Sequence, residues 1–363
     1  MNMKNTVKTS VVVMFLLIAF IMSCENSDKT NQRNSFYNYT NLSRLTDPQE
    51  NAYMLDELPD DITEICDIAN KQVVHYRLLS QHKIPRNEWE NSSSNHDILD
   101  ILDTIKTKGD RKLDINRHLE DRVLSSCAKE SIFLTGLLRH KDIPARIRVG
   151  YLTNLYKGSK AIEFWQNVNQ YERYEPVDTS VYNGWTRHNT EVNRSIEHYV
   201  TEYWDEKSEQ WRILDAMPAF LEYHGVFLQD KYHLVDGVNF EYAWQVWQKR
   251  DSIEEDAYAE RGWSAKTHVR YQMLMDFYCL LNHEGTAIFE DNGVQTDRND
   301  ERREFMEKDY DSLTDLEIIE LDKLAELLGT HPSVDELIVF YDSTKTLKLE
   351  EVEKDNYSFV FIR

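Results

Sequence analysis

The stretch from Ser125 to Asp215 constrains the fold most strongly, because it combines a helix, a sharp break and three strands. It opens with SSCAKESIFLTGLLRHKDIPARIRVGY and closes with EHYVTEYWDEKSEQWRILD. Residues 128–140 carry apolar side chains at helical spacing, and the sequence Asp-Ile-Pro that follows ends a helix. Residues 145–151 then alternate as in a strand. One face takes Ile147, Val149 and Tyr151, and the other takes Arg146 and Arg148.

Two further strands are expected at residues 197–204 and 210–214, joined by polar residues as a hairpin. If Trp204 pairs with Trp211, His198 becomes the diagonal neighbour of Asp215 on the same face. A register slip of one residue would place the two side chains on opposite faces. The alternation therefore predicts contact between an imidazole and a carboxylate, and such a carboxylate keeps one tautomer of the imidazole as a good base.

Cys127 is expected in the first turn of a buried helix, with Ser125 or Ser126 as its cap. The free N–H groups and the dipole at a helix start favour an anion, and so favour a thiolate. The residue types predict a nucleophile at Cys127, a base at His198 and an orienting acid at Asp215. The alternative is an inert buried cysteine, which is common in protein cores.

These residues also carry a family resemblance. A cysteine that opens a helix, then LLR-x-x-x-IPAR-x-x-x-GY, then H-x-x-x-E-x-W, a turn and W-x-x-x-D resembles the transglutaminase-like superfamily of papain-type cysteine enzymes. The resemblance implies an α+β, papain/transglutaminase-like core, with a nucleophile helix packed on an antiparallel sheet. By position, it matches Cys127 with the nucleophile, His198 with the base and Asp215 with the orienting acid.

The resemblance extends to a bacterial transglutaminase-like group with helical segments on both sides of the core. An arginine-rich lead-in, here residues 116–122, ends the N-terminal helical region of that group, and a helical part, here 240–342, follows the core. The group commonly has an arginine and an acidic residue just after the cysteine. Ala128 and Lys129 stand there in this chain, so the hydrogen bonding around the thiol is expected to differ.

The expected organisation is a signal peptide (1–23), a tether (24–45), an N-terminal helical region (46–116), a catalytic core (117–235) and a mainly helical C-terminal region (236–363). Helices are predicted at 56–81, 96–106, 242–250, 268–282 and 316–328, and a terminal hairpin at 346–363. Residues 154–193 form a long aromatic-rich segment. It either lines a substrate cleft or forms a packed lid without substrate contact.

The N-terminus has the pattern of a targeting segment. Lys4 and Lys8 precede an apolar run at residues 11–22, which is short for a spanning helix and typical of a signal peptide. Ser23 before Cys24 resembles a bacterial lipoprotein box, which implies cleavage before Cys24 and lipid attachment to it. We therefore expect a lipid-anchored protein of the bacterial cell envelope. The alternatives are a signal anchor or cleavage at another position.

The formal net charge of −22 argues against nucleic-acid binding, because such a chain repels phosphates. Cleavage before Cys24 would remove two lysines and no acid. Cys66 and Cys279 lie in apolar patterns and are expected to be small core residues, and a disulfide between them stays open. No cofactor or metal is expected, since the histidines have no zinc-binding spacing.

The expected chemistry is acyl transfer on a peptide or amide substrate, through a thioester at Cys127. Water as acceptor would give a protease, amidase or deamidase, and an amine would give a cross-linking enzyme. Hydrolysis is favoured, because no amine site is visible in the sequence. Two alternatives remain: a non-catalytic glycan- or peptide-binding envelope lipoprotein on a transglutaminase-like scaffold, and a lipoprotein scaffold for an envelope complex.

Overall fold

The computed structural model describes residues 37–79, 97–109, 112–113, 116–118, 121–153, 155, 195–259, 262–282 and 304–348. The expected signal peptide and the expected lipidation site, Cys24, lie outside the described residues. So do nearly all of the aromatic-rich segment 154–193 and most of the predicted terminal hairpin.

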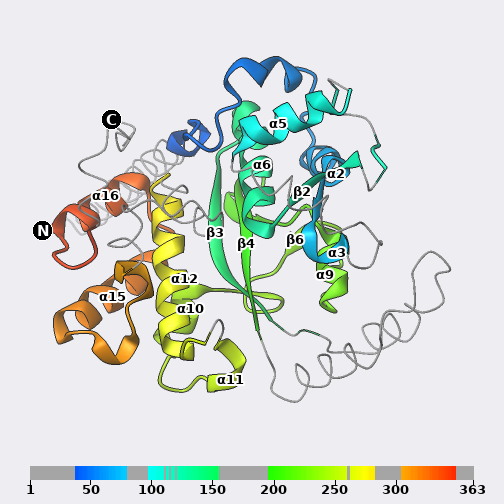
Figure 1. Ribbon diagram of the computed structural model, residues 1–363. Helices are drawn as coiled ribbons and strands as arrows, with labels where there is room; N and C mark the ends of the chain where they lie inside the picture. Colours follow the sequence, from blue (N-terminus) through cyan, green and yellow to red (C-terminus); the bar gives the residue numbers. More distant parts are fainter. Residues whose placement is uncertain are drawn as a thin grey trace, which may run out of the picture.

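The described chain is of α+β class, with helices packed on a five-stranded sheet (Figure 1). The strand order is β6-β5-β4-β3-β7, and every neighbouring pair is antiparallel. The bounds are β3 (Ala145–Leu152), β4 (Ile196–Asp205), β5 (Gln210–Leu214), β6 (His233–Leu234) and β7 (Phe240–Tyr242). A separate pair, β1 (Val73–His75) and β2 (Val123–Ser125), is parallel.

The remaining elements are helices. On the N-terminal side they are η1 (Tyr37–Thr40), η2 (Gln49–Met54), α2 (Ile62–Gln72), α3 (Tyr76–Leu79), α5 (Ile98–Thr107) and α6 (Cys127–His140). On the C-terminal side they are α9 (Pro218–Tyr223), α10 (Ala243–Gln248), α11 (Glu255–Tyr258), α12 (Ala265–Leu280), η7 (Tyr310–Ser312), α15 (Asp315–Leu328) and α16 (Val334–Ser343).

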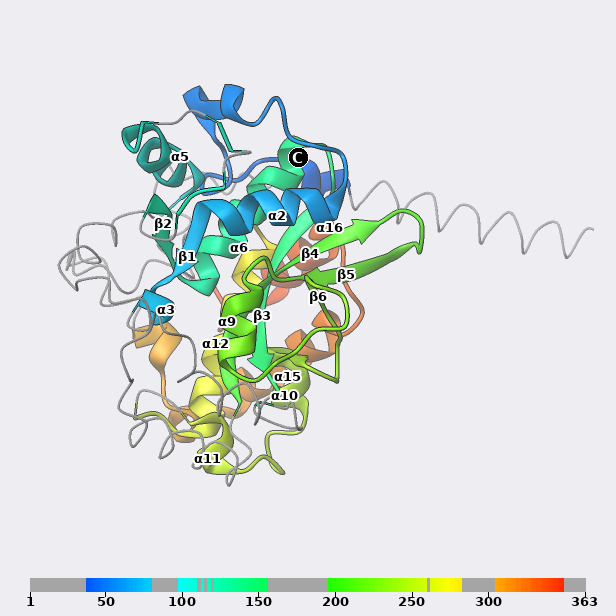
Figure 2. The same ribbon diagram turned by 90° about the vertical axis from the view of Figure 1, so that its right-hand side faces the viewer.

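Helix α6 is the centre of the N-terminal half of the structure. Its cap is Ser126, whose hydroxyl accepts a hydrogen bond from the Lys129 amide, as the sequence predicts. Every residue from Glu130 to Arg139 is buried, because α6 packs on β4 and β3 while α2 and α5 cover it from outside. Figure 2 shows α2 lying across α6, and the β4–β5 hairpin extending beyond the body of the sheet.

The helix predicted at 56–81 is present as α2 and α3, but it starts later than predicted and a strand at Val73–His75 interrupts it. Asp61 caps α2, and Val73 and Val74 form a strand that pairs with Val123 and Leu124. β-Branched residues favour strands, and here the partner strand lies about fifty positions away along the chain. The predicted tether is also wrong at its C-terminal end. Tyr39 and Leu45 are buried, and the Tyr39 hydroxyl donates a hydrogen bond to the Leu280 carbonyl at 3.1 Å.

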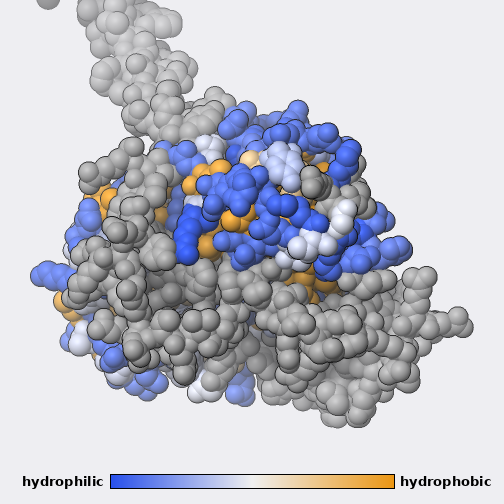
Figure 3. All heavy atoms as spheres, turned by 45° about the horizontal axis from the view of Figure 1, so that its top comes forward, coloured by the Kyte–Doolittle hydropathy of each residue, from blue (hydrophilic) through white to orange (hydrophobic). Residues whose placement is uncertain are grey.

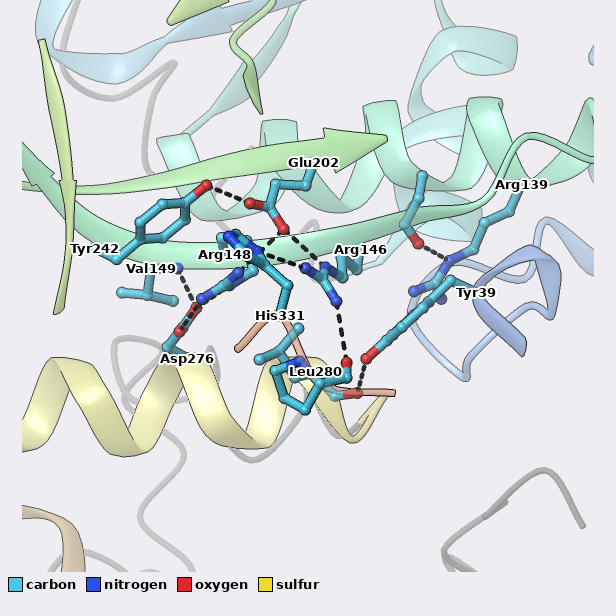
Figure 4. Close-up of polar contacts among 12 residues, drawn as sticks. Tyr39, Arg139, Arg146, Arg148, Val149, Glu202, Tyr242, Asp276, Leu280 and His331 are labelled. Atoms are coloured by element: carbon cyan, nitrogen blue, oxygen red, sulfur yellow. Dashed lines mark hydrogen bonds and ion pairs between the residues drawn. The ribbon is translucent and has the colours of Figure 1, made fainter. Parts of the chain in front are cut away.

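The other predicted helices are present as α5, α10, α12 and α15, with ends shifted by a few residues. Strands β3 and β4 run between α6 and α12, and α10 and α15 pack around α12 (Figures 1 and 4). Cys66 and Cys279 are fully buried, in two different apolar clusters. The expectation that both are core residues is therefore confirmed, and they form no disulfide.

A buried charge cluster joins α12 to the sheet (Figure 4). It consists of Arg146, Arg148, Glu202 and Asp276, whose side chains are all fully buried. Arg148 makes a two-pronged contact with Asp276, at 2.8 and 2.9 Å. Arg146 and Arg148 both donate to Glu202, at 2.7 and 3.1 Å. The arginines thus lie on one strand face, as the alternation predicts, and paired charges balance the cost of burying each one.

Glu202 is a buried acid whose charge is balanced by two arginines. Burial raises its pKa, but the charges of Arg148 and Arg146 outweigh that effect and hold the pKa of Glu202 well below its usual range. The Tyr242 hydroxyl also donates a hydrogen bond to Glu202. Glu202 is therefore ionised in the folded chain, as a buried carboxyl beside two guanidinium groups should be.

The face shown in Figure 3 is mainly hydrophilic where residues are described, and its apolar areas are small and separate. Within the described ranges, no helix combines the length and the apolar character that crossing a bilayer requires.

Candidate functional site

The first helical residue of α6 is Cys127, as the sequence predicts. Cys127 is partly exposed, in contrast to the fully buried Cys66 and Cys279. Burial raises the pKa of the Cys66 thiol well above its usual value, which makes that thiol a poor nucleophile. Of the three cysteines in the described part of the chain, Cys127 alone combines partial exposure with a helix start.

His198 and Asp215 come together through the register of the β4–β5 hairpin. Trp204 lies opposite Trp211, which is the pairing that would place His198 and Asp215 on the same face. Asp215 directly follows β5, and its Oδ2 accepts a hydrogen bond from Nε2 of His198. Both side chains are almost completely buried. The predicted contact between His198 and Asp215 is therefore present.

Backbone groups hold Asp215 in this position. Its Oδ1 accepts a hydrogen bond from the Met217 amide at 2.7 Å, and its own amide donates to the Tyr232 carbonyl at 2.9 Å. The ring of Phe220, on α9, stacks on the His198 ring with centroids 5.4 Å apart and an interplanar angle of 11°. The imidazole is thus fixed at its edge by a carboxylate and on its face by an aromatic ring.

This arrangement sets the tautomer of His198. A carboxylate only accepts hydrogen bonds, so the proton of a neutral His198 resides on Nε2. Nδ1 has no hydrogen-bond partner of normal geometry within the described ranges, which leaves it available to accept a proton. Burial disfavours a charged imidazole, but interactions with Asp215 and Cys127 outweigh burial and raise the pKa of His198 from 6.5 to about 10. The raised pKa favours a second proton on His198 at neutral pH, and Nδ1 is the atom that can take it.

A fourth ionisable side chain lies in the same site and is absent from the sequence analysis. Glu130 is in the first turn of α6 and is 1% exposed. Its Oε1 accepts a hydrogen bond from the Ala216 amide at 3.1 Å. Burial and the charge of Asp215 raise the pKa of Glu130 well above its usual value. The sequence signal for Glu130 was its place three residues after Cys127, on the same helical turn.

His75 is a second residue that sequence reasoning missed, because its strand was predicted as helix. It lies opposite Ser125 in the parallel β1–β2 pair, and Ser125 is two positions before Cys127 in the chain. Its ring packs on Phe220 with centroids 4.0 Å apart. His75 and His198 thus flank the same phenylalanine ring, and β1 forms part of the surroundings of the site.

The site has the parts of a nucleophile, a base and an orienting group. A thiol, an imidazole and a carboxylate in that order are typical of nucleophilic catalysis by cysteine. Across the described ranges, no set of three or more histidine, cysteine, aspartate or glutamate side chains is arranged to hold a metal ion.

Comparisons with known proteins do not add a family. No family model matches the chain. No curated protein and no solved structure matches it either. The resemblance to the transglutaminase-like superfamily therefore rests on the residues quoted above and stays a prediction.

Proposed function

We propose that this protein is a cysteine-nucleophile acyl-transfer enzyme that acts on a peptide or amide substrate. The observation that carries the proposal is the position of His198, whose Nε2 is bonded to Asp215 while the interaction with Cys127 raises its pKa. A buried histidine with a merely structural role needs one partner, whereas this one lies between an acid and a partly exposed thiol at a helix start. The resemblance to the transglutaminase-like superfamily supports the same roles.

The first half of the reaction forms a thioester. The Cys127 thiolate attacks the substrate carbonyl carbon, a C–S bond forms, and the carbonyl electrons move to oxygen. When the tetrahedral intermediate collapses, the C–N bond breaks and the leaving amine takes the proton from Nδ1 of His198. The amide N–H groups at the start of α6 are suited to bind the transient oxyanion.

The second half returns the enzyme to its starting state. A water molecule gives a proton to Nδ1 of His198 and attacks the thioester carbonyl, the C–S bond breaks, and Cys127 leaves as thiolate. An amine in place of water would give a cross-linked product. We propose hydrolysis, and we propose that the enzyme acts in the bacterial cell envelope, anchored by lipid at Cys24.

An activated ester tests thioester formation without knowledge of the natural substrate. Wild-type protein lacking residues 1–24 is mixed with p-nitrophenyl acetate, and release of p-nitrophenol is followed together with the mass of the intact protein. We expect a burst close to one equivalent and one acetyl group on Cys127. Cys127→Ala should show neither, and Cys279→Ala should behave as wild type.

The outcome against the proposal is equal acetylation of wild type and Cys127→Ala, or none in either. That result would favour the alternative of a glycan- or peptide-binding lipoprotein.

A second experiment separates water from an amine as the acceptor of the acetyl group. Hydroxylamine or a glycine amide is added to the acetylated enzyme. Hydrolysis predicts that the acetyl group goes to water at low amine concentration, and a cross-linking enzyme would transfer it to the amine.

A further inference from the structure

Glu130 and Glu202 are both buried glutamates, but their surroundings are opposite. Glu202 has two arginines as partners. Glu130 takes part in none of the ion pairs formed by the described residues, and its contact is the neutral Ala216 amide. A buried carboxylate without a cation is costly, and the usual response is that the carboxyl keeps its proton. These different surroundings favour an ionised Glu202 and a neutral Glu130.

Burial raises the pKa of Glu130, and the charges around it oppose one another: Asp215 and Cys127 raise this pKa and a charged His198 lowers it, but burial together with Asp215 outweighs His198. The ionisable groups that face it are Asp215 after β5, His198 on β4, Cys127 on its own helix and Cys66 on α2. Asp215 must be ionised to hold His198, and Cys127 must become an anion to react. Neither tolerates a second carboxylate nearby, because like charges a few ångströms apart in a buried site repel strongly.

Glu130 also contacts the backbone that positions Asp215. Its Oε1 takes the Ala216 amide, and the next amide, that of Met217, goes to Asp215. Two consecutive backbone N–H groups thus donate to different acids, one to Glu130 and the next to Asp215. A carbonyl oxygen is sufficient for this contact, so Glu130 can fix the backbone after β5 and remain neutral.

We propose that Glu130 is a positioning residue of the Cys127–His198–Asp215 site, which keeps its proton and holds the Ala216 amide so that Asp215 stays in line with His198. The proton on Glu130 keeps a second negative charge away from Cys127. With Glu130 neutral, the thiolate is the sole anion at the start of α6, where the helix dipole favours it. The proposal rests on the proposed function, because positioning matters only if the three residues react.

Substitution of Glu130 by glutamine tests whether it keeps its proton, and substitution by alanine tests whether it holds the Ala216 amide. Glu130→Gln is nearly isosteric, is neutral at every pH, and retains an oxygen for the Ala216 amide. Glu130→Ala leaves that amide unpaired. In Glu130→Gln we expect p-nitrophenyl acetate to acylate Cys127 at close to the wild-type rate. The acid limb of the plot of this rate against pH should stay where it is in wild type. We expect Glu130→Ala to lose about tenfold or more, since a lost buried hydrogen bond has that order of effect.

The matched control is Glu206→Gln, on the exposed turn of the β4–β5 hairpin, which should leave rate and profile unchanged. Thermal unfolding of each variant shows whether it is folded. A downward shift of the acid limb in Glu130→Gln by more than about half a pH unit would mean that an ionised carboxylate had been removed, and would overturn the proposal. A wild-type rate in a folded Glu130→Ala variant would overturn the positioning role.

Infrared difference spectroscopy of wild type against Glu130→Gln reads the proton directly, independently of activity. We expect the C=O stretch of a protonated carboxylic acid at neutral pH in wild type, absent from the variant. Its absence from wild type would refute the neutral Glu130. If Cys127 proves inert in wild type, the proposed function and the positioning role both fall, while the infrared band still decides the protonation state. The two failures are thereby distinguishable.

Discussion

Trp204 on β4 lies directly opposite Trp211 on β5, with ring centroids 5.7 Å apart. This one pairing fixes the register of the hairpin, and the register brings His198 and Asp215 together although they are seventeen positions apart. The acid–imidazole contact is thus set by strand pairing rather than by a mobile loop. A site built on paired strands keeps its geometry before substrate arrives.

Asp215 should act mainly by orienting His198 and by supporting its charge. Asp215→Asn keeps an oxygen that can accept the Nε2 proton but removes the negative charge, so we expect a moderate loss of acylation rate. The acid limb of the pH profile should also move to higher pH, because without the charge of Asp215 the imidazole holds its second proton less well and supports the Cys127 thiolate less. Asp215→Ala should lose about a hundredfold or more. The measurement is the rate of p-nitrophenol release against pH, and equal rates in the two variants would contradict an orienting role.

The raised pKa of His198 also predicts a pH dependence of stability. A base whose pKa is higher in the folded chain stabilises that state fully below its unfolded pKa, and this contribution disappears as the pH rises through the folded pKa. For His198 the window runs from 6.5 to about 10. The free energy of unfolding of wild type, relative to His198→Gln, should therefore fall across this window, by at most about 1.4 kcal/mol per pH unit.

Urea unfolding at several pH values measures that difference. Groups outside the site titrate alike in the two proteins and cancel to first order, so the difference reports the ionisation of His198 together with the site groups coupled to it. A difference that stays constant from pH 6 to about 10 would show that His198 does not gain affinity for its proton on folding.

Glu202 should be far more important for stability than an exposed acid. Glu202→Gln leaves Arg146 without its buried counterion, and breaking a buried pair in this way costs about 3–5 kcal/mol. The control is Asp251→Asn, which removes an exposed ion pair with Lys266 and should change the free energy of unfolding little. Chemical denaturation of both variants checks the prediction, and similar losses for the two would contradict the assigned role of the charge cluster.

Gly150 should be essential for the packing of β7 on β3. A Cβ added there would meet the Glu241 carbonyl, lie 2.7 Å from Cζ of Phe240 and 2.9 Å from Cα of Tyr242. Gly150→Ala should therefore destabilise the fold by about 2–3 kcal/mol, as overpacking does. Gly329→Ala is the matched control, because its nearest neighbour is a Trp244 ring atom at 3.1 Å, which can shift. Thermal unfolding compares the two, and equal effects would mean that β7 moves away at little cost.

The parts of the fold that could be predicted are those that depend on short spans of sequence. Ser126 caps α6 through an amide three residues away. The β4–β5 register follows from alternation within one hairpin, which is why the His198–Asp215 contact could be found. The class of the fold, helices on an antiparallel sheet, was implied by the family resemblance that the same stretch carries.

The parts that could not be predicted depend on partners far along the chain. Strand β1 looks helical by itself and becomes a strand by pairing with Val123 and Leu124. The backbone partner of Glu130 is an amide eighty-six positions away. The alternation of β3 gave the face of Arg148, but not the Asp276 of α12 that covers it. Such contacts join elements that are far apart in the chain, and local sequence patterns do not tell which distant elements pack together.

The central claim is that Cys127 and His198 form an activated pair, and the most direct test is the rate of iodoacetamide alkylation of Cys127 against pH. Folded wild-type protein lacking residues 1–24 is compared with His198→Ala, and peptide mass spectrometry separates Cys127 from the buried Cys66 and Cys279. We predict fast alkylation of Cys127 well below pH of about 8.5, where an ordinary thiol is half ionised, and loss of this reactivity in His198→Ala. Alkylation that follows an ordinary thiol profile in both proteins would contradict the account.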